Sequence, residues 1–180
     1  MVVDIYGSKE LFVNEYRTLL ADRLLAQLDF NPEKEIRNLE LLKLRFGESL
    51  LHTCEVMLKD ISDSKRINAH IHNSIETDTD PESTEGRAFK LSSLILSSQF
   101  WPAFKNDTLE LPPKLKEVYD KFTKSYEAYK GNRTLCWRPV IGRVDIEIEL
   151  AHKTLSLSVS PVHAVIIYEF QDQSKFKLVC

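Results

Sequence analysis

The chain has 180 residues, and its 24 lysines and arginines stand against 27 aspartates and glutamates, a net charge of −3. Hydrophobic residues at 43% and charged residues at 28% are typical of a globular protein and exclude a disordered chain or a whole-surface polycation. Three cysteines without a Cys-x-x-Cys pair indicate neither a disulfide framework nor a zinc cluster. The sequence has no signal-peptide pattern and no apolar run near the roughly 20 residues of a membrane span. We therefore expect a soluble intracellular domain.

Apolar residues at helical spacing predict three helices in the first half, at about residues 8–28, 32–46 and 49–71. Gly7-Ser8 offers a cap to the first helix. Asn31-Pro32 is typical of a helix start, and Gly47 of a helix end. Short connections favour antiparallel neighbours, so we expect a helical bundle over residues 1–75.

Residues 76–86 carry five acids, one proline and no apolar side chain. Such a segment cannot offset its ordering entropy by burial, which predicts a mobile acidic loop over 76–87. An acidic tail with a function of its own is the alternative, and a solvated connector is the interpretation that we favour.

The periodicity changes after this loop and predicts a mixture of strands and helices, at about 89–96 (strand), 114–129 (helix), 134–137 (strand), 144–150 and 154–159 (paired strands) and 161–170 (helix). The alternation of Val144, Ile146 and Ile148 with acids is the clearest period-two pattern in the chain. We expect an α+β fold, with the bundle followed by an α/β domain over 88–180 that holds a small, mainly antiparallel sheet.

Histidines are the first candidates for acid–base chemistry or metal binding. His70 and His72 lie two residues apart with no third ligand nearby, and His52 with Cys54 has the same weakness. A structural zinc site needs four well-spaced ligands, so we expect no metal and no other cofactor.

Ser160-Pro161-Val162-His163 could place a nucleophile beside a base, as in a small hydrolase. The Gly-x-Ser-x-Gly elbow of α/β hydrolases is missing, and five glycines leave no phosphate-binding loop. A Ser160 that caps a helix starting at Pro161 explains the spacing more simply. The hydrolase stays an alternative function.

Residues 112–143 hold eight basic and three acidic side chains, a local charge of +5 that leaves −8 for the rest. This basic stretch could bind an acidic partner segment or nucleic acid, and a plain solvated face is an equal alternative. The candidate patch residues are Lys114, Lys121, Lys124, Lys130 and Arg133. Since none of the usual nucleic-acid motifs is present, nucleic acid is the less favoured partner.

Several stretches resemble the cullin family in order and spacing through nearly the whole chain. They are Lys9 to Leu25 ending in Leu-Ala-Asp-Arg-Leu-Leu, Glu55-Val-Met-Leu-Lys-Asp-Ile61 with Ser64-Lys65, Leu94 to Trp101-Pro102, Leu111-Pro112, Phe122, Tyr126, Arg133-Thr-Leu-Cys-Trp137, Gly142 and Val159 to Phe170. Within the family, Asp4 to Phe12, Glu35 to Gly47 and Phe170 to Gln173 look most like the branch found in the anaphase-promoting complex.

This resemblance implies a non-catalytic scaffold of a multisubunit ubiquitin ligase with a role in the cell cycle, in the nucleus and cytoplasm. The implied partners are a small RING-finger subunit, the ubiquitin-conjugating enzyme that it recruits, and other subunits of the complex. In the family the RING subunit adds a strand to the cullin sheet, which is β-augmentation. We expect that docking on the strongest predicted strands, at Val144, Ile146, Ile148, Leu155, Leu157 and Val159.

Two departures from the family pattern concern the extent of the chain. The family's N-terminal repeats and its winged-helix domain have no counterpart here, which suggests a fragment or a shortened product. The modified lysine of cullins belongs to that winged helix, so no such regulation is assigned.

Overall fold

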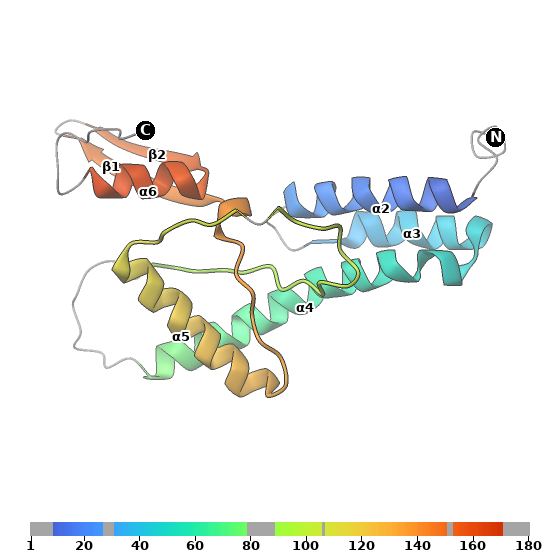
Figure 1. Ribbon diagram of the computed structural model, residues 1–180, viewed down its shortest axis with the longest axis horizontal. Helices are drawn as coiled ribbons and strands as arrows, with labels where there is room; N and C mark the ends of the chain where they lie inside the picture. The colour runs from blue at the N-terminus through green and yellow to red at the C-terminus, as the bar shows by residue number, and fades with distance from the viewer. Residues whose placement is uncertain (1–8, 27–30, 79–88, 106, 151–152, 171–180) are drawn as a thin grey trace. The chain divides into compact units, whose positions relative to one another are not determined.

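The computed structural model describes residues 9–26, 31–78, 89–105, 107–150 and 153–170. The chain divides into two compact units, Met1–Phe104 and Lys105–Cys180. Helices dominate the first unit, and the second adds a two-stranded antiparallel sheet (Figure 1). The expected α+β class is therefore confirmed. No helix within the described ranges is long and apolar enough to cross a membrane.

The described part of the first unit contains three helices, α2 (Lys9–Ala26), α3 (Glu33–Phe46) and α4 (Glu48–Asp78). The predicted boundaries of α3 are confirmed. The Asn31 side-chain oxygen accepts a hydrogen bond of 3.2 Å from the amide of Glu33. Gly47 ends α3 and is the single residue between α3 and α4. Its φ of 88° is a backbone conformation that residues with a side chain disfavour. The predicted cap at Gly7-Ser8 lies outside the described residues.

The core of the first unit forms where the apolar stripes of the three helices meet. Leu20, Leu51 and Met57 are fully buried there. They belong to one cluster with Val13, Ala21, Leu24, Leu39, Phe46, Cys54, Leu58, Ile61 and Trp101. Because these residues recur three and four positions apart, the periodicity that predicted the helices also selected the side chains that fill the core.

An ion pair joins α2 to α3 at the edge of this core. Arg23 donates from Nε and Nη2 to the two carboxylate oxygens of Glu35 at 2.9 and 2.8 Å. The guanidinium also lies 5.6 Å from the ring centroid of Tyr16. Burial raises the pKa of Tyr16, and the nearby Glu35 carboxylate raises it further. The bidentate geometry fixes how these two helices face each other.

Helix α4 continues to Asp78, so the predicted start of an acidic loop at residue 76 is wrong. Residues 79–88, the rest of that prediction, lie outside the described residues. The predicted helix end at Ile71 is also wrong, because the residues after it, polar apart from Ile75, continue the helix. A helical turn does not need an apolar face in order to form.

The segment 89–97 runs along α4 and is not a strand, contrary to prediction (Figure 1). Side chains of α4 take the place of a neighbouring strand. Asn68 donates to the carbonyl of Ser93 at 2.6 Å and accepts from its amide at 2.9 Å. These bonds tie the segment to the first unit, which ends at Phe104, whereas the sequence pattern placed the second domain from residue 88.

The second unit, which starts at Lys105, contains α5 (Pro113–Lys130), as predicted. Phe122 and Tyr126 are its buried residues. Trp137 packs on the helix, with its ring centroid 4.5 Å from that of Tyr119 and 5.6 Å from that of Phe122. The Trp137 indole donates to the Thr123 hydroxyl at 2.9 Å. Trp137 is therefore held by side chains of α5, and the prediction of residues 134–137 as a strand is wrong.

After the short 3-10 turn η1 (Pro139–Ile141), the chain forms β1 (Val144–Leu150) and β2 (Lys153–Val159), then α6 (Pro161–Glu169). The strands pair antiparallel from Val144 opposite Val159 to Leu150 opposite Lys153. Both strands and α6 confirm the prediction. Helix α6 contacts η1 and β1.

Candidate partner-docking surfaces

The hairpin of β1 and β2 gathers the six predicted docking residues on one face. The register places Val144 opposite Val159, Ile146 opposite Leu157, and Ile148 opposite Leu155. Side chains alternate between the two faces of a strand, so these three cross-strand pairs share one side. Five of the six are half-buried, and Leu157 is the most accessible at 41%.

The other face of the hairpin is polar. Asp145, Glu147 and Glu149 of β1 lie opposite Ser158, Ser156 and Thr154 of β2, and all six are exposed. The Ser158 hydroxyl donates to Asp145 at 2.6 Å. The hairpin therefore has one apolar and one acidic face.

Ser160 and His163 lie at the start of α6, as the spacing suggested. The Ser160 Oγ accepts from the backbone amide of His163 at 3.4 Å and lies 2.9 Å from its Nδ1. The hydroxyl therefore acts as the helix N-cap, as expected. Both residues are exposed, so the imidazole contact occurs at the surface. A capping hydroxyl explains this pair without catalysis.

The predicted basic patch is only partly assembled. Lys114, Lys121 and Lys124 are exposed and fall on one side of α5, since positions seven and ten residues along a helix share a face. Lys130 lies on a different side, with Nζ 4.9 Å from the ring centroid of Tyr129. Arg133 follows the helix in the segment after Gly131 and is exposed. Three of the five predicted residues, Lys114, Lys121 and Lys124, therefore share one face of α5.

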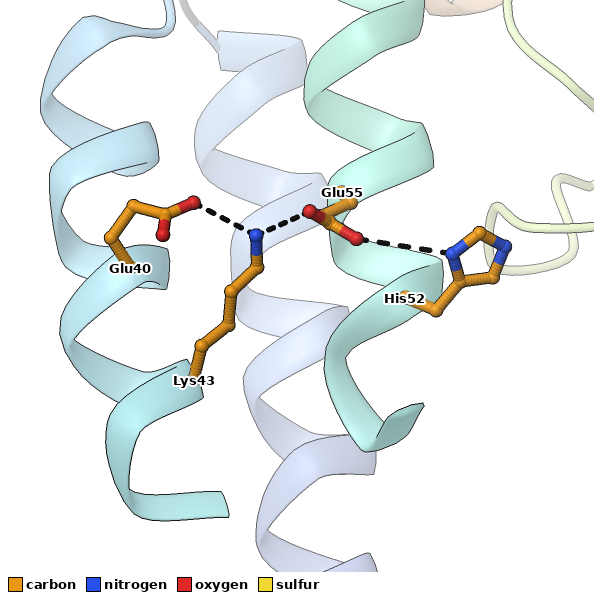
Figure 2. A network of polar contacts seen from close by, with 4 residues as sticks. All are labelled: Glu40, Lys43, His52 and Glu55. Carbon is orange, nitrogen blue, oxygen red and sulfur yellow. Dashed lines mark hydrogen bonds and ion pairs between the residues drawn. The ribbon is translucent and has the colours of Figure 1, made fainter. Parts of the chain in front are cut away.

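A polar network between α3 and α4 was not predicted (Figure 2). The Lys43 ammonium donates to Glu40 at 2.8 Å and to Glu55, while His52 Nδ1 lies 3.8 Å from the other Glu55 oxygen. The hydrogen bond to Glu40, and then that to Glu55, raises the pKa of Lys43 well above its usual range. Glu40 is exposed and Glu55 is half-buried, so this network lies near the surface and contributes modestly to the contact between the two helices.

The histidines considered as metal ligands have other surroundings. His72 Nε2 lies 2.7 Å from the carbonyl oxygen of Leu91. Cys54 is fully buried, and that burial raises the pKa of its thiol to about 11, which keeps it protonated at neutral pH. Within the described ranges, no three potential ligands come together in a way that could hold a metal ion.

Sequence reasoning also missed a row of polar residues on α4, namely Asp60, Ser64, Asn68 and His72. Each bonds to the segment that follows the helix, at Ser97, Ile95, Ser93 and Leu91 respectively. The repeated four-residue spacing of hydrogen-bonding side chains was the available signal. It places the row on one helix face.

Comparison with known proteins supports the resemblance over almost the whole chain. The cullin alpha+beta domain matches residues 95–179. Anaphase-promoting complex subunit 2 of Homo sapiens is 53% identical over 178 residues, which covers 99% of this chain and 21% of the relative. The Arabidopsis thaliana protein of that name is 40% identical over 176 residues, covering 98% of this chain and 20% of the relative.

A named cullin is also similar over most of the chain. Cullin-3 of Schizosaccharomyces pombe is 29% identical over 170 residues, covering 92% of this chain and 21% of the relative. The chain thus spans about one fifth of the length of these curated relatives. The comparisons therefore show a match to the cullin alpha+beta domain over residues 95–179 and similarity to anaphase-promoting complex subunit 2 over almost the whole chain.

Proposed function

We propose that this chain is a non-catalytic scaffold region of a RING-type ubiquitin ligase of the anaphase-promoting complex kind, acting in cell-cycle progression. The observation that carries the proposal is the similarity to anaphase-promoting complex subunit 2 over 99% of the chain. Its partners are a small RING-finger subunit, the ubiquitin-conjugating enzyme bound by that subunit, and other subunits of the complex. The working compartments are the nucleus and cytoplasm.

A scaffold contributes to ubiquitin transfer through distance and orientation. Holding the conjugating enzyme near its substrate converts an encounter between free molecules into a reaction within one assembly. This role requires rigid surfaces, and it requires no catalytic side chains in the scaffold itself. The Ser160 hydroxyl, which accepts the amide of His163 as a helix cap, fits this role better than the alternative hydrolase does.

The RING subunit docks on the hairpin in this proposal. The apolar face offers Leu157 at its most accessible point, flanked by Leu155 and Val159 on β2. Val144, Ile146 and Ile148 of β1 lie opposite these three residues and complete the surface. An added strand would extend this apolar face while its backbone bonds to a free edge of the hairpin.

A matched pair of variants on β2 tests this docking. Leu157→Lys places a charge on the apolar face, whereas Ser156→Lys places the same charge on the acidic face opposite Glu147. We expect Leu157→Lys to weaken binding of the purified RING subunit at least about tenfold, because an ammonium group would be desolvated in the interface. Ser156→Lys should bind like the unmodified chain.

The measurement is isothermal titration of the 180-residue chain with the RING subunit, with circular dichroism to confirm that both variants are folded. Binding in a 1:1 ratio that only Leu157→Lys impairs supports the proposal. A folded chain that does not bind the RING subunit contradicts the scaffold role, and equal binding by both variants contradicts the hairpin surface.

The lysine trio of α5 is proposed as a contact for an acidic segment of a partner. Lys114, Lys121 and Lys124 lie on one helix face with Glu117 among them. Lys121→Glu with Lys124→Glu should weaken such a contact, and the loss should shrink as salt rises, since exposed charges are screened. Lys130→Glu, on a different side of the helix, is the control. Equal losses in both variants would contradict a defined face.

A further inference from the structure

One side of α3 presents the two most exposed large apolar side chains among the described residues. Leu44 is 87% exposed and Leu41 is 68% exposed. They lie three residues apart, which places them on neighbouring turns of one helix face. The opposite side of α3 carries Leu39 and Phe46, which are buried in the core of the first unit. The exposed pair is therefore additional to the apolar residues that hold α3 in place.

Basic side chains surround the two leucines. A helix turns by about 100° per residue, so Lys34, Arg37 and Arg45 point within about 40° of the direction of Leu41. All three are exposed. We call the five residues Lys34, Arg37, Leu41, Leu44 and Arg45 the basic–apolar face of α3. This face holds three positive charges and no carboxylate.

The acidic residues of α3 do not neutralise this face. Glu35 is buried and accepts from Arg23 of α2, and Glu40 accepts from Lys43 at 2.8 Å on the side towards α4 (Figure 2). Glu33 lies about two turns before the leucines. Lys34 and Arg37 form no ion pair with any residue that the structure describes. Their charge is therefore available to a partner.

Another exposed leucine in the first unit shows what is specific about α3. Leu19 of α2 is 55% exposed, but Glu15 lies four residues before it and Asp22 three residues after it, so both carboxylates share its helix face. Both acids are exposed. A partner that suits the basic–apolar face would be repelled at Leu19, which makes Leu19 a matched control.

We propose that the basic–apolar face of α3 docks an acidic amphipathic helix of a partner protein. The apolar side of that helix covers Leu41 and Leu44, and its carboxylates pair with Lys34 and Arg37. The backbone of α3 is bonded within the helix and offers nothing to an extended partner, so the partner must satisfy its own backbone groups, as a helix does. Docking of an amphipathic helix through apolar anchors is a common mode of recognition. The inference does not depend on the docking of the RING subunit.

Phosphate-rich partners match the face less well. Most contacts to nucleic acid are made to phosphate and sugar, which would leave two leucines uncovered. A flat anionic bilayer would bring its headgroups against Glu33 and Glu40 at the border of the face as well as against the cations. A helix can place carboxylates over Lys34 and Arg37 alone, and charge complementarity of this kind gives specificity.

A synthetic acidic peptide of about 18 residues tests the face, since a chain of this length can form an isolated helix. It carries leucines at three- and four-residue spacing on one side, with glutamates beside them. One control peptide replaces glutamate by lysine, and another has the same composition with the leucines spread around the helix. We expect the acidic peptide to bind the 180-residue chain at least about tenfold more tightly than either control, and to shift the methyl resonances of Leu41 and Leu44.

Variants of the chain locate the contact. Leu44→Ser should weaken peptide binding about tenfold with an unchanged melting temperature, because its side chain is exposed in the free chain. Leu19→Ser should bind normally. Arg37→Glu should also weaken binding about tenfold, and this loss should shrink as salt rises. Lys121→Glu with Lys124→Glu should leave the affinity unchanged, which separates this face from the lysines of α5.

The outcomes decide between the possible occupants. Binding that Leu44→Ser and Arg37→Glu impair, and Leu19→Ser does not, supports the inference. Equal binding of all three peptides, no binding of the acidic peptide, or a loss caused only by the α5 variant overturns it. So does a dimer in sedimentation that Leu44→Ser dissociates, or pelleting with phosphatidylserine vesicles that Leu44→Ser abolishes. Titration of Leu44→Ser with the RING subunit should give the same affinity as the unmodified chain, so failure here leaves the scaffold role standing.

Discussion

Asp60 shows how one side chain can fix a segment far along the sequence. Its Oδ2 accepts from the Ser97 amide at 2.8 Å and from the Trp101 indole at 2.9 Å, and its Oδ1 accepts from the Ser97 hydroxyl at 3.0 Å. Trp101 is only 4% exposed, so its indole N–H has little access to water as a substitute partner. The sequence contains this residue inside a recognisable Met-Leu-Lys-Asp stretch, but its partners lie about 40 residues away and follow no local pattern.

Asp60→Ala should lower the free energy of unfolding by about 3 kcal/mol, because it removes a charged acceptor and leaves a buried indole donor unpaired. Asp63→Ala is the control, since Asp63 pairs with Arg66 at the surface and should cost less than about 0.5 kcal/mol. Urea denaturation followed by circular dichroism measures both. Equal losses would mean that the Asp60 bonds contribute nothing specific.

Cys54 is a second residue whose surroundings set its chemistry. Burial raises the pKa of its thiol to about 11, so the folded state holds this proton more tightly than the unfolded state does. Its contribution to stability is therefore complete below the unfolded pKa of about 8.5 and is lost as the pH rises towards about 11. The stability difference between the unmodified chain and Cys54→Ala should shrink across this range.

Chemical unfolding at several pH values between 8 and 11, on both chains, measures that difference and cancels the titration of tyrosines. A difference that stays constant would contradict the burial of the thiol. Thiol labelling at neutral pH, resolved by peptide mass, provides a separate check, because exposed Cys136 should react much faster than Cys54.

At the scale of elements, hydrophobic periodicity predicted the helices and the hairpin. It failed for the segments whose conformation depends on hydrogen bonds from side chains. Helices α2, α3 and α5 and the hairpin were predicted because their apolar residues repeat with the period of a helix or a strand. Residues 89–96 and 134–137 also have strand-like composition. Their backbones lie against helices, where side chains replace a neighbouring strand, and composition alone cannot distinguish these two surroundings.

The candidate surfaces follow the same division. Alternation along β1 and β2 was enough to place six apolar residues on one face, which the register bears out. The basic patch was defined by a window of sequence, and a helix scatters such a window around its axis. Only Lys114, Lys121 and Lys124 satisfy the helical spacing, so Lys130 and Arg133 lie elsewhere.

Trp137 gives a prediction about how α5 is held to the segment that follows it. Trp137→Ala should destabilise the second unit by about 3 kcal/mol, because it removes the ring contacts with Tyr119 and Phe122 and the bond to Thr123. Trp137→Phe should cost about 1 kcal/mol, since it loses mainly the hydrogen bond. Thermal unfolding measures both, and exposed Arg138→Ala is the control. A Trp137→Phe loss as large as that of Trp137→Ala would contradict the packing role.

At the scale of the whole molecule, the chain consists of two compact units, and each contains one tryptophan. Trp101 lies in the core of the first unit, and Trp137 packs on α5 in the second. The domain boundary was placed at residue 88 because the acidic stretch looks like a connector. Side chains of α4, from Asp60 to His72, instead bond to residues 91–97, so hydrogen bonds rather than composition decide which unit these residues belong to.

Fluorotryptophan labelling can test whether the two units unfold separately. In Asp60→Ala, the fluorine signal of Trp101 should lose its native position at a lower urea concentration, because only the first unit is weakened. The signal of Trp137 should keep its midpoint. A shared midpoint that moves for both signals would show a single cooperative unit.

The row of bonds from Asp60, Ser64, Asn68 and His72 of α4 to every second residue of 91–97 can repeat only over a short length. A helix advances about 1.5 Å per residue and an extended chain about 3.3 Å, so each step of four helix residues falls about 0.6 Å short of two segment residues. Over the three steps from Asp60 to His72 this drift reaches about 2 Å, close to what flexible side chains of different length can absorb. A fifth bond in this row would require a bend in the helix or a twist in the segment. Pairing of this kind therefore suits a short contact between a helix and an extended segment and could not be continued as the pairing of two strands can.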